Sequence, residues 1–462
     1  MKSRRAISVV GVLFLLAAGG LAGLYLSGRR NVTTSSAAAY EAYRKGIENE
    51  HRFYFKEARV AYAKALALDP DFAMATLGLA RTSEHDQALS LTERARRRID
   101  RLNENERLHV DLQWALVNGK REEALKVARA IHEKYPDDIW AANMLCSDEL
   151  GKGNSDRALA IFAEVLAVDP NNALAYNLIG YYQGYRGDYD KAIENLKKYQ
   201  FMAPDQANPY DSLGEIQAYS GHYDEAIANL NRALAIKADF YESYGHLGVA
   251  YEGKGDYAKA LENYVKAAQA GVNDSLRRYF LIEALRVAGE SRDVGSVREI
   301  AGRLEAAPKD KYSDARKAAC RVVVDILEGR PVQAEASLRE MRATLESFFE
   351  KQPKDSGLKF YEPAWNHLMA WAKVAQGKDD EAIALYEEMT NPPNPWRDFK
   401  DRRFVYEGRA FLAALLAKKG ELDRAEKLLE ENRRWNPSWA PTRQAELTVA
   451  QVRREKVLAA AK

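Results

Sequence analysis

A period of 34 residues runs through the middle of the chain, and it limits the possible folds more than any other feature. Small or apolar residues recur at this interval, and an alanine follows each of them twelve residues later. These positions are Leu112, Cys146, Gly180, Gly214 and Gly248, followed by Ala124, Ala158, Ala192, Ala226 and Ala260. A fixed period of this length is typical of a repeat architecture, in which each unit packs on its neighbours. We therefore expect a stacked array rather than one central core.

Further recurring residues inside each unit predict a pair of helices. Four residues beyond each alanine lies Ala128, Phe162, Leu196, Leu230 or Tyr264, and Pro136, Pro170 and Pro204 follow three of the units. Proline after a second helix stops it, and glycine near the turn, as at Gly187 and Gly255, favours a helix end in the left-handed conformation. Because two helices that cross closely need small side chains, we expect the small residue of the first helix to meet the small residue of the second.

These residues resemble the tetratricopeptide repeat. The resemblance is carried by the segment from Leu213-Gly214 to Tyr223-Asp224-Glu225-Ala226, by the segment from Gly180 to Ala192 and by Leu247-Gly248 with Gly255-Asp256-Tyr257. It implies an all-α fold, a right-handed α-solenoid of stacked helix-turn-helix repeats. It also implies that the first helices line a concave groove, which receives a peptide segment of a partner protein.

These sequence features divide the chain into consecutive regions. We expect a short basic segment at 1–6, a transmembrane helix at 7–26 and a linker at 27–38, followed by a repeat array at 39–274 with a divergent unit at 73–104. Degenerate helical hairpins at 275–362 come next, then two further repeats at 363–439 with an inserted proline-rich loop at 391–405, and a capping helix at 440–462.

The amino terminus predicts a membrane anchor. Ile7 to Leu26 is apolar or small apart from Ser8, and twenty helical residues span roughly 30 Å, the thickness of the hydrocarbon layer. Three basic residues precede this segment and two follow it, which favours a cytoplasmic amino terminus. The array would then lie on the periplasmic side of a bacterial inner membrane. The alternative is a cleaved signal peptide, which would give a secreted or periplasmic protein.

The expected groove carries aromatic, amide and acidic side chains. Residues three or four apart share a helical face, and the face opposite the packed one holds Trp140, Asn143, Asn177, Tyr181, Tyr185, Asn208, Asp211, Glu215, Tyr219, Glu242 and Glu252. Tyrosine rings and carboxylates suit a peptide that bears lysine or arginine. The alternative is that the tyrosines stack between successive first helices and that the acids form a solvated face.

The sequence favours a protein-binding scaffold over an enzyme. It has no Gly-rich phosphate loop ending in Gly-Lys-Ser/Thr, no His-Glu-x-x-His pair and no Gly-x-Ser-x-Gly elbow. We expect no catalytic residue, cofactor or metal. The net charge of +2 gives no reason to expect nucleic acid. The competing hypothesis is a periplasmic or secreted repeat protein that binds a small ligand or glycan.

Overall fold

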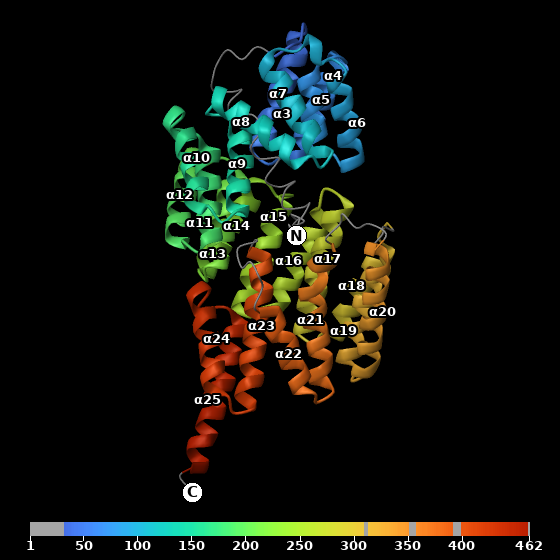
Figure 1. Ribbon diagram of the computed structural model, residues 1–462, viewed down its shortest axis with the longest axis vertical. Coiled ribbons are helices and arrows are strands. Elements are labelled where there is room, and N and C mark those ends of the chain that lie inside the picture. The colour runs from blue at the N-terminus through green and yellow to red at the C-terminus, as the bar shows by residue number, and fades with distance from the viewer. Residues whose placement is uncertain (1–31, 309–312, 351–356, 391–398, 461–462) are drawn as a thin grey trace. The chain divides into compact units, whose positions relative to one another are not determined.

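The computed structural model describes residues 32–308, 313–350, 357–390 and 399–460, and these residues fold into stacked α-helices (Figure 1). They divide into two compact units. The amino-terminal unit holds residues 32–186 and 190–212, and the carboxy-terminal unit holds residues 187–189 and 213–460. The predicted all-α array of stacked helical repeats is confirmed.

Helix pairs with short turns make up the amino-terminal unit. The helices are α3 (Ala37–His51), α4 (Phe55–Leu68), α5 (Ala73–Arg81), α6 (His85–Arg96), α7 (Glu104–Val117), α8 (Arg121–Lys134), α9 (Ile139–Gly151), α10 (Ser155–Val168), α11 (Ala173–Arg186) and α12 (Tyr189–Met202), with a short 3-10 helix at Ile99–Arg101. Its core is apolar and includes the aromatic rings of Tyr43, Tyr62 and Phe162.

The helix pairs continue in the carboxy-terminal unit, and α13 (Ala207–Tyr219) crosses from one unit into the other. The helices that follow are α14 (Tyr223–Ile236), α15 (Tyr241–Lys254), α16 (Tyr257–Ala270), α17 (Asp274–Glu290), α18 (Val294–Ala306), α19 (Ser313–Leu327), α20 (Pro331–Glu350), α21 (Gly357–Ala375), α22 (Asp379–Thr390), α23 (Phe399–Lys418), α24 (Leu422–Trp435) and α25 (Ala440–Ala460).

The recurring glycines Gly180 and Gly214 lie where the helices of a pair approach closely, and each meets the expected alanine together with a larger side chain. A Cβ atom added at Gly214 would lie 2.7 Å from Cγ of Leu230 and 3.1 Å from the backbone oxygen of Ala226. The glycine therefore faces the backbone of the alanine's turn and the large side chain four residues further on. The expected approach of the two small residues therefore occurs through the backbone of the alanine, and the large residue four positions later fills the space that the glycine leaves.

The predicted helix ends occur at the expected residues. Gly187 and Gly255 have φ angles of +85° and +84°, in the left-handed region that favours glycine. Pro136 and Pro170 follow the ends of α8 and α10. Both cysteines of the chain, Cys146 and Cys320, are buried.

Two predicted segments lie wholly or partly outside the described residues. The predicted transmembrane helix at 7–26 lies outside the described residues, and no helix within the described ranges is long and apolar enough to cross a membrane. The predicted loop at 391–405 is wrong for residues 399–405, because α23 begins at Phe399. Arg403 and Glu407, four residues apart on this helix, are buried against charged residues of α15 and α17. This tertiary contact stabilises a helix in residues 399–405, which the repeat spacing alone predicted to be part of an inserted loop.

Candidate functional site

In the amino-terminal unit, the predicted groove residues lie on three successive first helices. Trp140 and Asn143 lie on α9, Asn177, Tyr181 and Tyr185 on α11, and Asn208 and Asp211 on α13. The two tyrosines are partly exposed, whereas the other five residues are buried. The face is thus less accessible than the sequence suggests, and its accessible part is aromatic.

The tyrosines of α11 make contacts within this helix and with the neighbouring first helices. Tyr181 donates a hydrogen bond from its hydroxyl group to Oγ of Ser212, at 3.3 Å, and the ring centroids of Tyr181 and Tyr185 are 6.3 Å apart. The hydroxyl group of Tyr182 donates to Oδ1 of Asn143 at 3.2 Å. These contacts agree with the alternative in which the tyrosines join successive first helices. The same residues can still present ring faces to a ligand, because Tyr181 and Tyr185 remain partly exposed.

Two polar atoms on α9 and α11 are buried without a hydrogen-bond partner among the described residues. They are Nε1 of Trp140, a donor, and Oδ1 of Asn177, an acceptor. The two helices contact each other. A buried polar atom without a partner costs roughly 1–3 kcal/mol, so a ligand that supplies the missing hydrogen bonds would recover part of this free energy. We regard this pair as the strongest indication of a binding site in the amino-terminal unit.

In the carboxy-terminal unit, most of the predicted groove residues contact other residues of the same chain. Glu215 lies 3.3 Å from Nε2 of His246, and the backbone oxygen of Tyr219 accepts a hydrogen bond from Nδ2 of Asn436 at 3.0 Å. Glu242 is partly exposed. Glu252 is completely buried. Whether the predicted groove residues bind a peptide is untested and stays a prediction, but Glu252 is not on an open acidic surface.

Glu252 belongs to a buried charge cluster formed by α15, α17 and α23. We define the charge cluster as Glu252, Glu283, Arg286, Glu290, Arg403 and Glu407. Arg286 lies at its centre. Its Nη2 donates to Oε2 of Glu252 at 2.5 Å, and its Nη1 donates to Oε1 of Glu290 at 2.5 Å and to Oε1 of Glu407 at 3.2 Å.

Arg403 connects the same cluster to α23. Its Nη2 donates to Oε2 of Glu283, and its Nη1 lies 3.3 Å from the hydroxyl oxygen of Tyr264 and 3.7 Å from Oε2 of Glu252. The hydroxyl group of Tyr264 itself donates to Oε2 of Glu252 at 3.1 Å. The first helices α15, α17 and α23 therefore meet at this cluster. The resemblance assigns a ligand groove to these first helices, but here they bind one another.

Burial raises the pKa of two carboxyl groups in this cluster. The pKa of Glu407 is raised well above its usual value by burial, and the neighbouring carboxyl groups of Glu290 and Glu252 add to the shift, although Arg286 opposes it. Burial also raises the pKa of Glu290, against the opposing effect of Arg286. Low dielectric and nearby like charge both disfavour an ionised carboxylate. Both groups therefore hold protons more tightly than carboxyl groups in water.

The charge cluster contains carboxylate oxygens close enough to share a metal ion. Oxygens of Glu252, Glu290 and Glu407 lie within 4.8 Å of one another. However, the guanidinium group of Arg286 binds all three carboxyl groups. A resident metal would have to compete with this fixed cation, so we assign the cluster to Arg286 rather than to a metal.

A smaller version of the same arrangement occurs in the amino-terminal unit. Glu50 of α3 accepts a hydrogen bond from the hydroxyl group of Tyr62 on α4, and Arg81 of α5 donates to both of its carboxylate oxygens, at 2.8 and 3.0 Å. Both units thus contain a glutamate, a tyrosine twelve residues later and an arginine on the next first helix. The 34-residue spacing alone does not indicate this pattern, although a glutamate four residues after the recurring glycine and twelve before a tyrosine is a detectable signal in the sequence.

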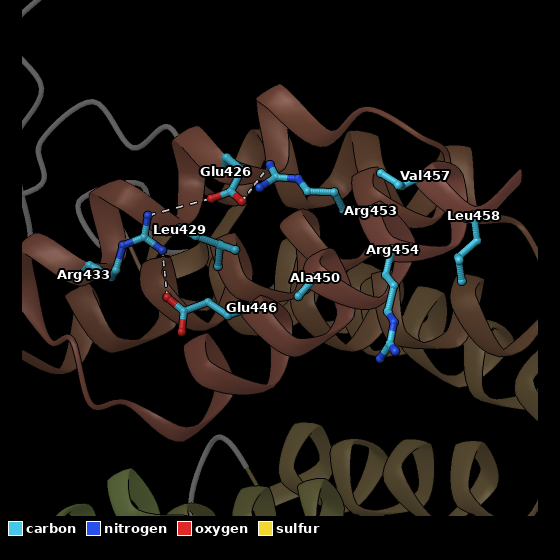
Figure 2. A pocket seen from close by; sticks show the side chains of 9 residues that line it. All are labelled: Glu426, Leu429, Arg433, Glu446, Ala450, Arg453, Arg454, Val457 and Leu458. Atoms are coloured by element: carbon cyan, nitrogen blue, oxygen red, sulfur yellow. Dashed lines mark hydrogen bonds and ion pairs between the residues drawn. The ribbon is translucent and has the colours of Figure 1, made fainter. Parts of the chain in front are cut away.

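A hollow lies between α24 and α25 (Figure 2), with a volume of about 510 Å³. Leu429, Ala450, Val457 and Leu458 give it an apolar lining. Ion pairs cross it from Arg433 to Glu446 at 2.8 Å and from Arg453 to Glu426 at 3.0 Å. In Figure 2 the side chain of Arg454 points away from both pairs. Sequence analysis did not identify this hollow, because spacing alone does not show which surface is concave.

The solved structures that match this chain have low sequence identity to it. MamA matches with 23% identity and a TM-score of 0.29, covering 34% of this chain and 93% of that one. The APC/C hetero-tetramer Cut9–Hcn1 matches with 14% identity and a TM-score of 0.46, covering 90% of this chain and 76% of that one. A Thermobaculum terrenum O-GlcNAc transferase mutant matches with 23% identity and a TM-score of 0.25, covering 27% and 24%. No curated protein matches.

Family comparisons identify the repeats directly. Residues 214–255 match the family described as TPR repeat, and residues 143–207 and 241–270 match families described as tetratricopeptide repeat. The matched segments coincide with the regular helix pairs between α9 and α16. Residues 143–207 and 214–270 of the chain therefore carry tetratricopeptide-type repeats.

Proposed function

We propose that this protein is a non-catalytic scaffold that binds peptide segments of partner proteins along α9 and α11. Tetratricopeptide repeats generally bind proteins. The observation that supports this location is the buried donor of Trp140 and the buried acceptor of Asn177, neither of which has a partner among the described residues. An extended peptide offers a backbone N–H and C=O at every residue, and so could satisfy both atoms.

The charge of the peptide is a separate part of the proposal. The sequence favours basic peptides, but Glu215 lies beside His246 and Glu252 beside Arg286. The fixed positive charge of Arg286 reduces the negative potential that a basic peptide would meet at Glu252. Aromatic contact with Tyr181 and Tyr185 therefore carries more of the proposed recognition than charge does.

A peptide array tests this proposal. Labelled full-length protein is applied to arrays of basic, acidic and neutral peptides, and the dissociation constants of the binders are measured in solution. Truncating a tyrosine at the centre of an interface typically costs more than 1 kcal/mol, so Tyr181→Ala should weaken binding by roughly tenfold. Asn177→Ala, which removes the buried acceptor, should also weaken it.

Tyr176→Ala is the matched control. Tyr176 lies on α11 as well, but its ring lies 5.8 Å from Nζ of Lys198 on α12, the second helix of the pair. Tyr176→Ala should therefore leave the dissociation constant unchanged. Equal binding by wild type, Tyr181→Ala and Asn177→Ala, with intact helical circular dichroism, would show that peptides do not use this face.

The hollow between α24 and α25 supports the alternative function, the binding of a small ligand. Its volume of about 510 Å³ lies within the range of small-molecule sites. Under this alternative, Arg454→Ala would abolish binding of small molecules found by thermal-shift screening, whereas Tyr181→Ala would not. The reverse outcome would favour the peptide-binding scaffold.

We also propose a membrane tether through residues 7–26, with the repeats on the periplasmic side of a bacterial inner membrane. It is supported by the apolar run and its basic flanks alone. Alkaline extraction should leave the full chain in the membrane fraction, and protease added to spheroplasts should digest the repeats. A soluble protein whose mature amino terminus starts after residue 26 would indicate signal cleavage instead.

A further inference from the structure

The charge cluster joins segments that lie far apart in the sequence. Arg403 and Glu407 of α23 reach Glu252 of α15 and Glu283 and Arg286 of α17, which lie more than a hundred residues earlier. The six members of the cluster are at most about a tenth exposed. Contacts within a repeat array normally join neighbouring repeats. This contact therefore holds the carboxy-terminal unit closed along its first helices.

The cluster holds more acidic than basic groups. Four carboxyl groups face two guanidinium groups, so full ionisation would leave two negative charges without a cation inside the cluster. Glu290 and Glu407 share one nitrogen, Nη1 of Arg286. Oε2 of Glu407 is buried and has no hydrogen-bond partner within the described part of the chain. Two ionised carboxylates around one NH2 group of a guanidinium repel each other, and a proton on one of them removes the repulsion.

We propose that Glu407 makes α23 a proton-loaded latch, which closes the first-helix face of α15 and α17 while its carboxyl group is protonated and opens when the proton is lost. Opening would expose Glu252, Glu283 and Arg286. These residues lie on the first helices α15 and α17, where the resemblance implies a ligand groove. This inference concerns the carboxy-terminal unit, and it does not depend on peptide binding along α9 and α11.

A proton explains the geometry better than a metal ion. Arg286 already occupies the centre of the three carboxyl groups that could hold a metal. Its guanidinium group stays charged at all accessible pH values, and it would repel a second cation. A proton needs no additional space and can reside on the free oxygen of Glu407.

Other titratable groups around the latch keep one protonation state near neutral pH. Burial raises the pKa values of Tyr257, Tyr264 and Tyr386 above their usual range. Burial and Arg286 lower the pKa of His367 to about 4, so that this side chain is neutral. The groups that face the latch are Glu252 on α15, Tyr257 and Tyr264 on α16, Glu283, Arg286 and Glu290 on α17, His367 on α21, Tyr386 on α22, and Arg403 and Glu407 on α23. Glu290 and Glu407, whose pKa values burial raises, are therefore the groups whose proton loss can open it.

The sign of the pH effect follows from the raised pKa. The folded state holds the proton more tightly than the unfolded chain, so the contact is strongest below the ordinary carboxyl pKa and weakens as pH rises toward the raised value. Each pH unit in this window increases the opening equilibrium constant of α23 by up to about tenfold for each proton released.

Hydrogen exchange of the full-length protein tests the latch. Protection of α23 amides is measured from pH 6 to pH 9, corrected for the intrinsic exchange rate, with peptides from α10 as an internal reference. We expect wild-type α23 to lose protection as pH rises. Glu407→Gln keeps the shape of the protonated side chain and has no proton to lose, so it should flatten this dependence, and Glu290→Gln/Glu407→Gln should abolish it.

Glu446→Gln is the control, because Glu446 pairs with Arg433 outside the charge cluster. It should retain the wild-type pH dependence. The proposal is refuted if wild-type α23 shows constant protection, or if millimolar Mg²⁺ or Ca²⁺ restores protection at pH 9. Failure of Glu407→Gln to fold would also refute it, since this variant mimics the protonated state that the latch requires.

Discussion

Adding one methyl group at Gly214 is a direct test of the packing within a helix pair. Gly214→Ala would gain roughly 1 kcal/mol from helix propensity. The new Cβ, however, would lie 2.7 Å from Cγ of Leu230, 3.0 Å from its Cδ2 and 3.1 Å from the backbone oxygen of Ala226. Overpacking typically costs about 1–3 kcal/mol. The backbone oxygen belongs to α14 and cannot rotate away, so we expect a cost in the upper part of this range, about 2–3 kcal/mol. After the gain from helix propensity, the free energy of unfolding should fall by about 1–2 kcal/mol.

Gly302 provides a matched control in the same unit. It lies inside α18 and is exposed, and an added Cβ would meet no atom within 4 Å. Gly302→Ala should therefore stabilise the unit by up to roughly 1 kcal/mol. Urea denaturation followed by circular dichroism would measure both variants. If Gly214→Ala stabilised the protein as much as Gly302→Ala does, the explanation for the recurring glycines would be wrong.

Two further predictions concern charged side chains. Arg81→Leu leaves the carboxyl group of Glu50 buried without its cation, and should lower the free energy of unfolding by roughly 3–5 kcal/mol; Arg44→Leu, at an exposed ion pair, should change it by less than about 1 kcal/mol in the same urea titration. Hydrogen bonds, first that from Gln376, lower the pKa of Glu335 to about 2, so the stability that this group contributes is complete above its ordinary pKa and is lost as pH falls toward 2. Melting curves should therefore show a smaller acid-induced decrease for Glu335→Gln than for wild type, and identical decreases would contradict this assignment.

Local features of the fold could be predicted from the sequence because they repeat. Gly180, Gly214 and Gly248 recur with a fixed period, and each lies against the second helix of its own pair. Gly187 and Gly255 adopt the predicted left-handed conformation. Such features depend on residues within one repeat, and a periodic pattern reports these contacts reliably.

Contacts between distant repeats could not be predicted in the same way. Glu252 was assigned to an open acidic groove because it shares a helical face with other polar residues. The residues that bury it, Arg286 and Arg403, lie on α17 and α23. Arg403 belongs to a segment that was predicted to be a loop, so no pattern linked it to Glu252. Helical spacing tells which residues share a face, but it does not tell whether another helix covers that face.

The two glutamate–tyrosine–arginine groups show how a local contact can become a long-range one. In each unit the tyrosine, Tyr62 or Tyr264, fills the space beside a glycine, and its hydroxyl group needs an acceptor, which Glu50 or Glu252 provides. The buried carboxylate then needs a cation, and the next first helix supplies an arginine in both units. Among the described residues, a second arginine, Arg403, approaches the same carboxylate in the carboxy-terminal unit alone and brings α23 with it. The side chain that fills the gap beside a glycine can therefore determine whether a first-helix face contacts only its neighbouring helices or also packs against a helix from a distant repeat.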